Sequence, residues 1–146
     1  MQKINLVIPD NMDYRTSEAY RTLRTNVLFC GEEINAIAVT SCTPGEGKSE
    51  VSFRLAESLA ETDRKILYID ADLRRSVFSK AISGSTQEVK GLSHYLSGQE
   101  ELVQSLCATK YFQSACHPSG AGTAKSIRIT RERTFQTANG KDTCTL

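Results

Sequence analysis

Two short apolar runs and one helical stripe organise the first half of the chain. The segments over residues 36–40 and 65–70 each contain four consecutive residues, 36–39 and 66–69, that are apolar or aromatic without alternation, which is typical of strands buried on both faces of a parallel sheet. Between them, apolar residues recur at helical spacing and predict a helix over residues 48–61. Strand, turn, helix and strand in this order predict a βαβ unit with a right-handed crossover, and therefore a parallel sheet.

Three further helices are predicted on either side of this unit. The longest covers residues 16–28, with Thr16 or Ser17 as its N-cap and an apolar stripe at helical spacing. Shorter helices are expected over residues 91–98, which end in a glycine, and over residues 100–107. Beyond this point apolar residues follow neither the strand nor the helix period, so no regular element is expected there.

Composition narrows the class of protein. The chain has 146 residues, enough for one domain, and 18 Lys plus Arg balance 17 Asp plus Glu. This balance gives no electrostatic reason to expect nucleic acid as a partner. No apolar stretch approaches the roughly 20 residues of a membrane span, and the start does not resemble a signal peptide, so a cytoplasmic protein is expected. The five cysteines form no metal-ligand spacing.

One loop carries the strongest chemical signal. The run Thr-Pro-Gly-Glu-Gly-Lys-Ser occupies positions 43–49, between the first apolar run and the predicted helix. In that context the glycines let backbone N–H groups turn toward a phosphate, Lys48 reaches the β- and γ-phosphates, and Ser49 offers its hydroxyl to Mg²⁺. The pattern G-x-x-x-x-G-K-[ST] has glycine where this chain has Cys42. The flanking strand and helix nevertheless favour a phosphate site over a solvated glycine-rich turn.

Two carboxylates follow the second apolar run. Asp70 and Asp72 lie just past the predicted strand, and ligands of doubly wound sheets bind outside the carboxyl ends of strands. The pair suits Mg²⁺, which prefers oxygen ligands, and one carboxylate can act as a base toward an attacking hydroxyl. A helix N-cap with a first-turn acid is the alternative. Arg74 and Arg75, next in the chain, fit either a phosphate or subunit contact or a solvated helix start.

Several motifs in this order resemble bacterial tyrosine kinases of the capsular and exopolysaccharide type. Residues 44–49 resemble the Walker A motif of these kinases and residues 66–75 resemble their Walker A′ motif. Residues 91–98 are similar to their G-L-S-x-x-L-x-G segment, and residues 17–26 are similar to their oligomerisation helix. The resemblance extends over residues 13–110 and implies an α/β, Rossmann-like P-loop domain with a parallel sheet.

The resemblance implies an ATP-dependent tyrosine autokinase that regulates capsular or exopolysaccharide biosynthesis, with ATP and Mg²⁺ as cofactors. The implied partners are a membrane-bound activator, the polysaccharide co-polymerase, and further copies of the chain, but no nucleic acid. The activator would hold the cytoplasmic protein at the inner face of the plasma membrane. In the family, Glu18, Arg21 and Arg24 would pair between subunits of a ring. From spacing alone, a solvated charged face is the default.

The same resemblance assigns three kinds of site residue. The expected nucleotide contacts are Thr43, Pro44, Gly45, Glu46, Gly47, Lys48, Ser49 and Glu50. The expected metal contacts are Ser49, Asp70 and Asp72, and the expected catalytic residues are Lys48, Asp70 as the base, and Asp72.

Two other classes of function remain open. ParA and MinD-type ATPases share the fold, but they carry a signature lysine five residues before the phosphate-loop lysine, where this chain has Thr43. The other alternative is a catalytically silent interaction module that binds ATP and keeps the charged helix without turnover. Phosphotyrosine formation separates the kinase from the silent module.

The end of the chain departs from the family. A Walker B strand and a C-terminal tyrosine cluster are not found, so the domain over residues 1–110 is expected to be incomplete at its C-terminal end, with weakened activity. Codons permitted for residues 116–141, read one nucleotide downstream, allow the family-like string V-I-P-A-G-P-E-P-P-N-P-S-E-L-L-E-S-E-H-F-R-Q-L-M-E. We therefore predict that residues 111–146 are a frameshifted, poorly ordered tail.

Overall fold

The computed structural model describes residues 2–4, 12–31, 34–62, 64–73, 90–111, 113–115, 124–130, 135–136 and 143–144, and the strands beyond residue 111 are described by their backbone. The elements follow one another as β1 (Gln2–Lys3), α1 (Tyr14–Phe29), β2 (Ala36–Val39), α2 (Lys48–Ala60), β3 (Lys65–Ala71), α4 (Leu92–Leu96), α5 (Leu102–Ser105), β4 (Leu106–Ala108), β5 (Gln113–Ala115), β6 (Ala124–Thr130), β7 (Phe135–Gln136) and β8 (Thr143–Cys144).

The main sheet is mixed, which corrects the predicted parallel sheet. Its six strands have the order β1-β4-β5-β3-β6-β2. β1 is parallel to β4 and β3 is parallel to β5, whereas β6 is antiparallel to both β2 and β3. Because β2 and β3 both oppose β6, they run parallel to each other, as the βαβ prediction requires. β6 occupies the position between them.

The described residues beyond position 111 form four strands, where no regular element is expected from the sequence. β6 pairs Ala38 with Ser126 on one side and Tyr68 with Ile127 on the other. The facing edges of β2 and β3 present backbone N–H and C=O groups that need partners. Any extended backbone can supply these partners, so hydrophobic periodicity does not reveal the strand. The predicted poor order of residues 111–146 as a whole stays a prediction.

The helices begin and end close to the predicted positions, with two corrections. Asp13, and not Thr16 or Ser17, caps α1, because its Oδ1 accepts the Thr16 N–H at 2.7 Å. This bond to the Thr16 backbone is the main cause of a lowered pKa of Asp13. The predicted helix over residues 100–107 is shorter and ends at Ser105, because the following residues are extended and pair with β1 and β5.

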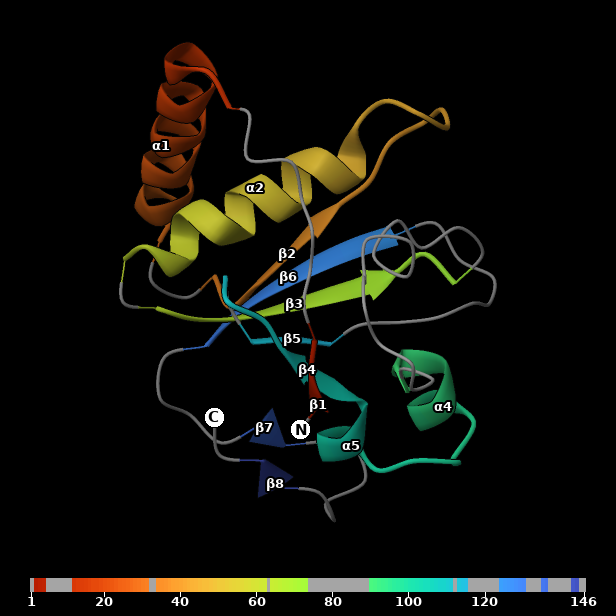
Figure 1. The fold of residues 1–146 in the computed structure, drawn as a ribbon. Coiled ribbons are helices and arrows are strands. Elements are labelled where there is room, and N and C mark those ends of the chain that lie inside the picture. Colours follow the sequence, from red (N-terminus) through yellow and green to blue (C-terminus); the bar gives the residue numbers. More distant parts are fainter. Residues whose placement is uncertain are drawn as a thin grey trace.

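The core lies between α2 and the sheet. Leu55, Ala56 and Leu59 of α2 are buried against Ile66 and Tyr68 of β3. α1 and α2 lie on the same face of the sheet (Figure 1). This packing fixes α2 on β3 and thereby fixes the loop that precedes α2. In the part of the chain that is described, no helix has both the length and the apolar character needed to cross a membrane.

Candidate phosphate-binding site

The loop between β2 and α2 contains two glycines in the left-handed region. Gly45 has φ 85° and Gly47, the N-cap of α2, has φ 82°. A side chain is strained in this conformation, so glycine is required for the loop to enter the helix in this way. The Val51 N–H donates to the Gly47 carbonyl at 2.9 Å and closes the first helical turn. α2 therefore begins at Lys48, and its first N–H groups lie at a helix N-terminus, which suits an anion.

The Lys48 side chain is half-buried at this helix start. Within the described ranges, its ammonium group makes no hydrogen bond or ion pair. A lysine with no carboxylate partner keeps its full charge for an incoming anion. Lys48 is the first residue of α2, which is the position that the sequence pattern predicts for the lysine that contacts phosphate.

Two acidic residues near the loop have different partners. The Thr43 hydroxyl donates to the Glu46 carboxylate inside the loop, and this bond is the main cause of a lowered pKa of Glu46. The Ser41 hydroxyl donates to the Thr43 carbonyl at 3.1 Å and adds to the order of the loop. Glu50 instead accepts a bond from Arg54 Nε at 3.0 Å, along the side of α2. Of the two acidic residues among the predicted nucleotide contacts, Glu46 is therefore bonded within the loop and Glu50 is bonded to α2, away from the loop.

The predicted carboxylates lie at the end of β3. Asp70 is fully buried, and its Oδ1 accepts the Asp72 N–H at 2.9 Å, while Asp72 is half-buried. Arg74 and Arg75 lie outside the described residues. Because β2 and β3 run parallel, the phosphate loop and the two carboxylates leave the sheet at the same edge (Figure 1). This is the edge where parallel α/β proteins bind ligands.

The donor set fits a hard divalent cation. The Ser49 hydroxyl and the two carboxylates all offer oxygen, which Mg²⁺ prefers. In the described part of the chain, no group of three or more His, Cys, Asp and Glu side chains could hold a metal ion. Mg²⁺ usually binds through one or two carboxylates, waters and substrate phosphates rather than in an all-protein cage. The residues present fit this mode of binding.

A pair of buried hydroxyls supports the loop and is missed by the sequence patterns. The Ser52 hydroxyl lies 3.1 Å from the Ser49 carbonyl, to which it donates, and 3.0 Å from the Tyr68 hydroxyl. Both Ser52 and Tyr68 are fully buried. A tyrosine within an otherwise apolar strand needs a partner for its hydroxyl. Tyr68 was therefore the one feature of the sequence that could have indicated this buried hydrogen bond. The partner is set by packing and is not visible in the sequence.

The strand, the glycine loop with Lys48 and Ser49, and the helix define an α/β protein of the phosphate-loop class. No protein-family model matches the chain. Tyrosine-protein kinase CpsD of Streptococcus agalactiae is 43% identical over 106 residues, which are 73% of this chain and 46% of the relative. CpsD of Streptococcus pneumoniae is 34% identical over 121 residues, 83% of this chain and 53% of the relative. Tyrosine-protein kinase etk of Escherichia coli K12 is 40% identical over 103 residues, 69% of this chain and 14% of the relative.

A solved structure agrees with these relatives. The kinase domain of Escherichia coli tyrosine kinase ETK superposes with a TM-score of 0.62 at 27% identity, covering 80% of this chain and 55% of that domain. The chain is therefore a homologue of the bacterial tyrosine-protein kinases, and the resemblance inferred from its motifs is confirmed. It spans about half the length of the CpsD relatives that it matches.

Proposed function

We propose that this chain is the ATP-binding part of a protein-tyrosine autokinase that regulates capsular or exopolysaccharide biosynthesis. The observation that carries the proposal is the start of α2. Gly45 and Gly47 adopt left-handed conformations there, and Lys48 has no partner among the described residues. The names of the relatives support tyrosine as the acceptor of the phosphoryl group.

Each site residue has a role in this proposal. The loop over residues 43–49 binds the phosphates through backbone N–H groups, and Lys48 neutralises the charge that develops during transfer. Ser49, Asp70 and Asp72 would hold Mg²⁺, which would neutralise charge on the phosphates. Asp70 accepts the proton of the tyrosine hydroxyl as its oxygen bonds to the γ-phosphorus and the bond to ADP breaks.

The proposed partners follow from the family. Further copies of the chain would assemble through the charged face of α1, and a membrane-bound polysaccharide co-polymerase would act as the activator. The protein would then be cytoplasmic and peripheral to the inner face of the plasma membrane. The near balance of 18 basic and 17 acidic residues supports a protein partner over nucleic acid.

Cys42 offers a direct test of nucleotide binding. Its thiol is exposed in the loop. Cys30 is exposed at the C-terminal end of α1, and Cys107 is buried. We expect Mg-ATP to slow the alkylation of Cys42 by iodoacetamide and to leave Cys30 unchanged, as followed by mass spectrometry of the peptides. The variant Lys48→Met should lose this protection, whereas Lys110→Met, a lysine outside the loop, should keep it. Equal Cys42 rates with and without saturating ATP would contradict the proposal.

A second assay separates binding from chemistry. The purified chain is incubated with Mg-ATP and probed for phosphotyrosine, with Asp70→Asn as the control that removes the base. Phosphotyrosine that disappears in this variant supports the kinase. Protection of Cys42 without phosphotyrosine identifies a silent ATP-binding module instead. ATP hydrolysis stimulated by DNA or lipid would indicate a ParA or MinD-like ATPase.

A further inference from the structure

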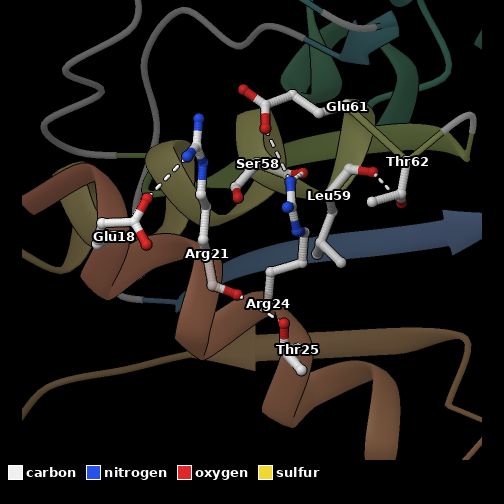
Figure 2. A network of polar contacts seen from close by, with 8 residues as sticks. All are labelled: Glu18, Arg21, Arg24, Thr25, Ser58, Leu59, Glu61 and Thr62. Atoms are coloured by element: carbon white, nitrogen blue, oxygen red, sulfur yellow. Dashed lines mark hydrogen bonds and ion pairs between the residues drawn. The ribbon is translucent and has the colours of Figure 1, made fainter. Parts of the chain in front are cut away.

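Glu18, Arg21 and Arg24 follow one another on α1, but their surroundings differ (Figure 2). Glu18 and Arg21 bond to each other, with 2.7 Å between Glu18 Oε1 and Arg21 Nη1, and their side chains are 43% and 54% exposed. The Arg24 side chain is only 18% exposed. The first two residues therefore face solvent, and the third is turned toward α2 of its own chain.

Arg24 contacts the C-terminal end of α2. Its Nη1 donates to the Ser58 carbonyl at 2.7 Å and to Glu61 Oε2 at 2.8 Å (Figure 2). Carbonyl oxygens in the last turn of a helix have no N–H partner within it. The Thr62 N–H, which a longer helix would direct to Ser58, bonds to the Leu59 carbonyl at 3.1 Å. Arg24 thus satisfies a carbonyl that α2 leaves open and places positive charge at the negative end of the helix dipole.

The two contacts of Arg24 contribute unequally to the stability of the chain. Glu61 is 57% exposed, so the ion pair alone contributes little. The bond to the Ser58 carbonyl is partly buried and charge-assisted, and such bonds are stronger. An Arg24 side chain recruited by another copy of the chain would have to give up both contacts and leave the Ser58 carbonyl without its donor.

We propose that Arg24 is an intramolecular anchor that holds α1 against the phosphate-loop helix, and that self-association through α1 uses Glu18 and Arg21 without it. The second half rests on the self-assembly proposed above, whereas the anchor is a property of one chain. The phosphate loop lies at the other end of α2, about 15 Å from Ser58 at 1.5 Å per residue. Arg24 is therefore a positioning residue that acts through α2 and does not contact phosphate.

Unfolding of the dilute monomer tests the anchor. At a concentration where sedimentation shows a single chain, Arg24→Met should lower Tm by roughly 3–6 °C. The matched variant Arg21→Met removes an exposed arginine of the same helix and should lower Tm by less than about 1 °C. Glu61→Gln should have a small effect that vanishes in the background of Arg24→Met, because the two side chains interact. Arg24→Lys, which keeps the charge, should restore part of the loss and of the amide protection in the last turn of α2.

Assembly of the same variants at high protein concentration tests the second half of the proposal, that self-association does not use Arg24. Arg21→Met and Glu18→Gln should weaken any assembly detected by sedimentation, whereas Arg24→Lys should preserve it. An unchanged Tm of the Arg24→Met monomer overturns the anchor, and loss of assembly in Arg24→Lys overturns the second half of the proposal. If Arg24→Met does not fold, the Glu61→Gln and Arg24→Lys values still decide the anchor. Absence of assembly in the wild-type chain would refute the self-assembly proposal, while the monomer Tm values would still decide the anchor.

Discussion

The hydroxyls of Ser52 and Tyr68 lie 3.0 Å apart in the core, where they join α2 to β3. Because Ser52 uses its proton for the Ser49 carbonyl, Tyr68 is the donor to Ser52. The connection links the first turn of α2, which carries Ser49, to the strand β3, which carries Asp70 near its C-terminal end. Its two members thus hold together the elements that bear the proposed metal contacts.

Removing the Tyr68 hydroxyl should weaken this connection. We expect Tyr68→Phe to lower the free energy of unfolding by about 1–2 kcal/mol, because a buried hydrogen bond is lost while the ring packing is kept. Chemical denaturation measures the difference. The variant Tyr95→Phe is the control, since Tyr95 is only half-buried on the short helix α4. Equal stability of Tyr68→Phe and the wild type would show that the bond makes no net contribution.

Removing the Ser58 hydroxyl should instead stabilise the folded chain. This hydroxyl is buried and has no hydrogen-bond partner among the described residues, and a buried unsatisfied polar group destabilises the folded state. Alanine also has the higher helix propensity. We therefore expect Ser58→Ala to raise the free energy of unfolding by about 1 kcal/mol. A loss of stability in thermal unfolding would contradict this expectation and point to a partner for the hydroxyl.

The order of the phosphate loop should depend on pH through Glu46. Its pKa is lowered in the folded loop, chiefly by the Thr43 hydroxyl. A depressed pKa means that the ionised carboxylate orders the loop at pH values above its usual pKa of about 4.3. That contribution is lost as the pH falls through the lowered pKa. Hydrogen exchange of the loop amides should therefore reveal a less protected loop in Glu46→Gln at neutral pH, and Thr43→Val should behave alike.

If exchange in Glu46→Gln equals that of the wild type at neutral pH, the carboxylate does not order the loop. Glu101→Gln is the matched control, because Glu101 is exposed and makes no capping hydrogen bond at α5.

The strand β6 should be needed for the sheet. Deletion of residues 124–146 keeps β5 and would uncover the facing edges of β2 and β3, and unpaired strand edges promote aggregation. Deletion of residues 131–146 keeps β6 and, among the strands that the structure describes, removes the separate β7–β8 pair. We expect the longer deletion to aggregate and to lose amide protection in β2 and β3, and the shorter one to remain close to the full chain. Similar behaviour of both would mean that β6 is dispensable.

The coding DNA tests the origin of the tail. Sequencing across codons 100–146 should find the family-like string one nucleotide downstream of the present frame. A single-base artefact near codon 110 would mean that the true protein continues as a longer kinase. Confirmation of the present frame, with the string one base over, would indicate a frameshifted gene. Without such a string in the DNA, the frameshift hypothesis is wrong.

Much of the fold and the site was predictable because it depends on neighbours in the sequence. The helical spacing of apolar residues sets α2, and two apolar runs set β2 and β3. The two left-handed glycines and the lysine at the start of α2 follow from the order of residues over positions 43–49. A pattern of this kind determines a local conformation, and the local conformation here is the site.

The tertiary structure decided the features that join distant residues. From its sequence position, Arg24 could equally have faced solvent or another copy of the chain. It bonds to Ser58 and Glu61, which are 34 and 37 residues later in the sequence, only because α1 packs against α2. The Tyr68 hydroxyl finds Ser52, 16 residues earlier, for the same reason. The place of β6 between β2 and β3 has no local signal, because backbone groups pair without regard to side-chain pattern. Local spacing specifies which conformations a segment prefers, whereas packing alone specifies which distant groups come within bonding distance.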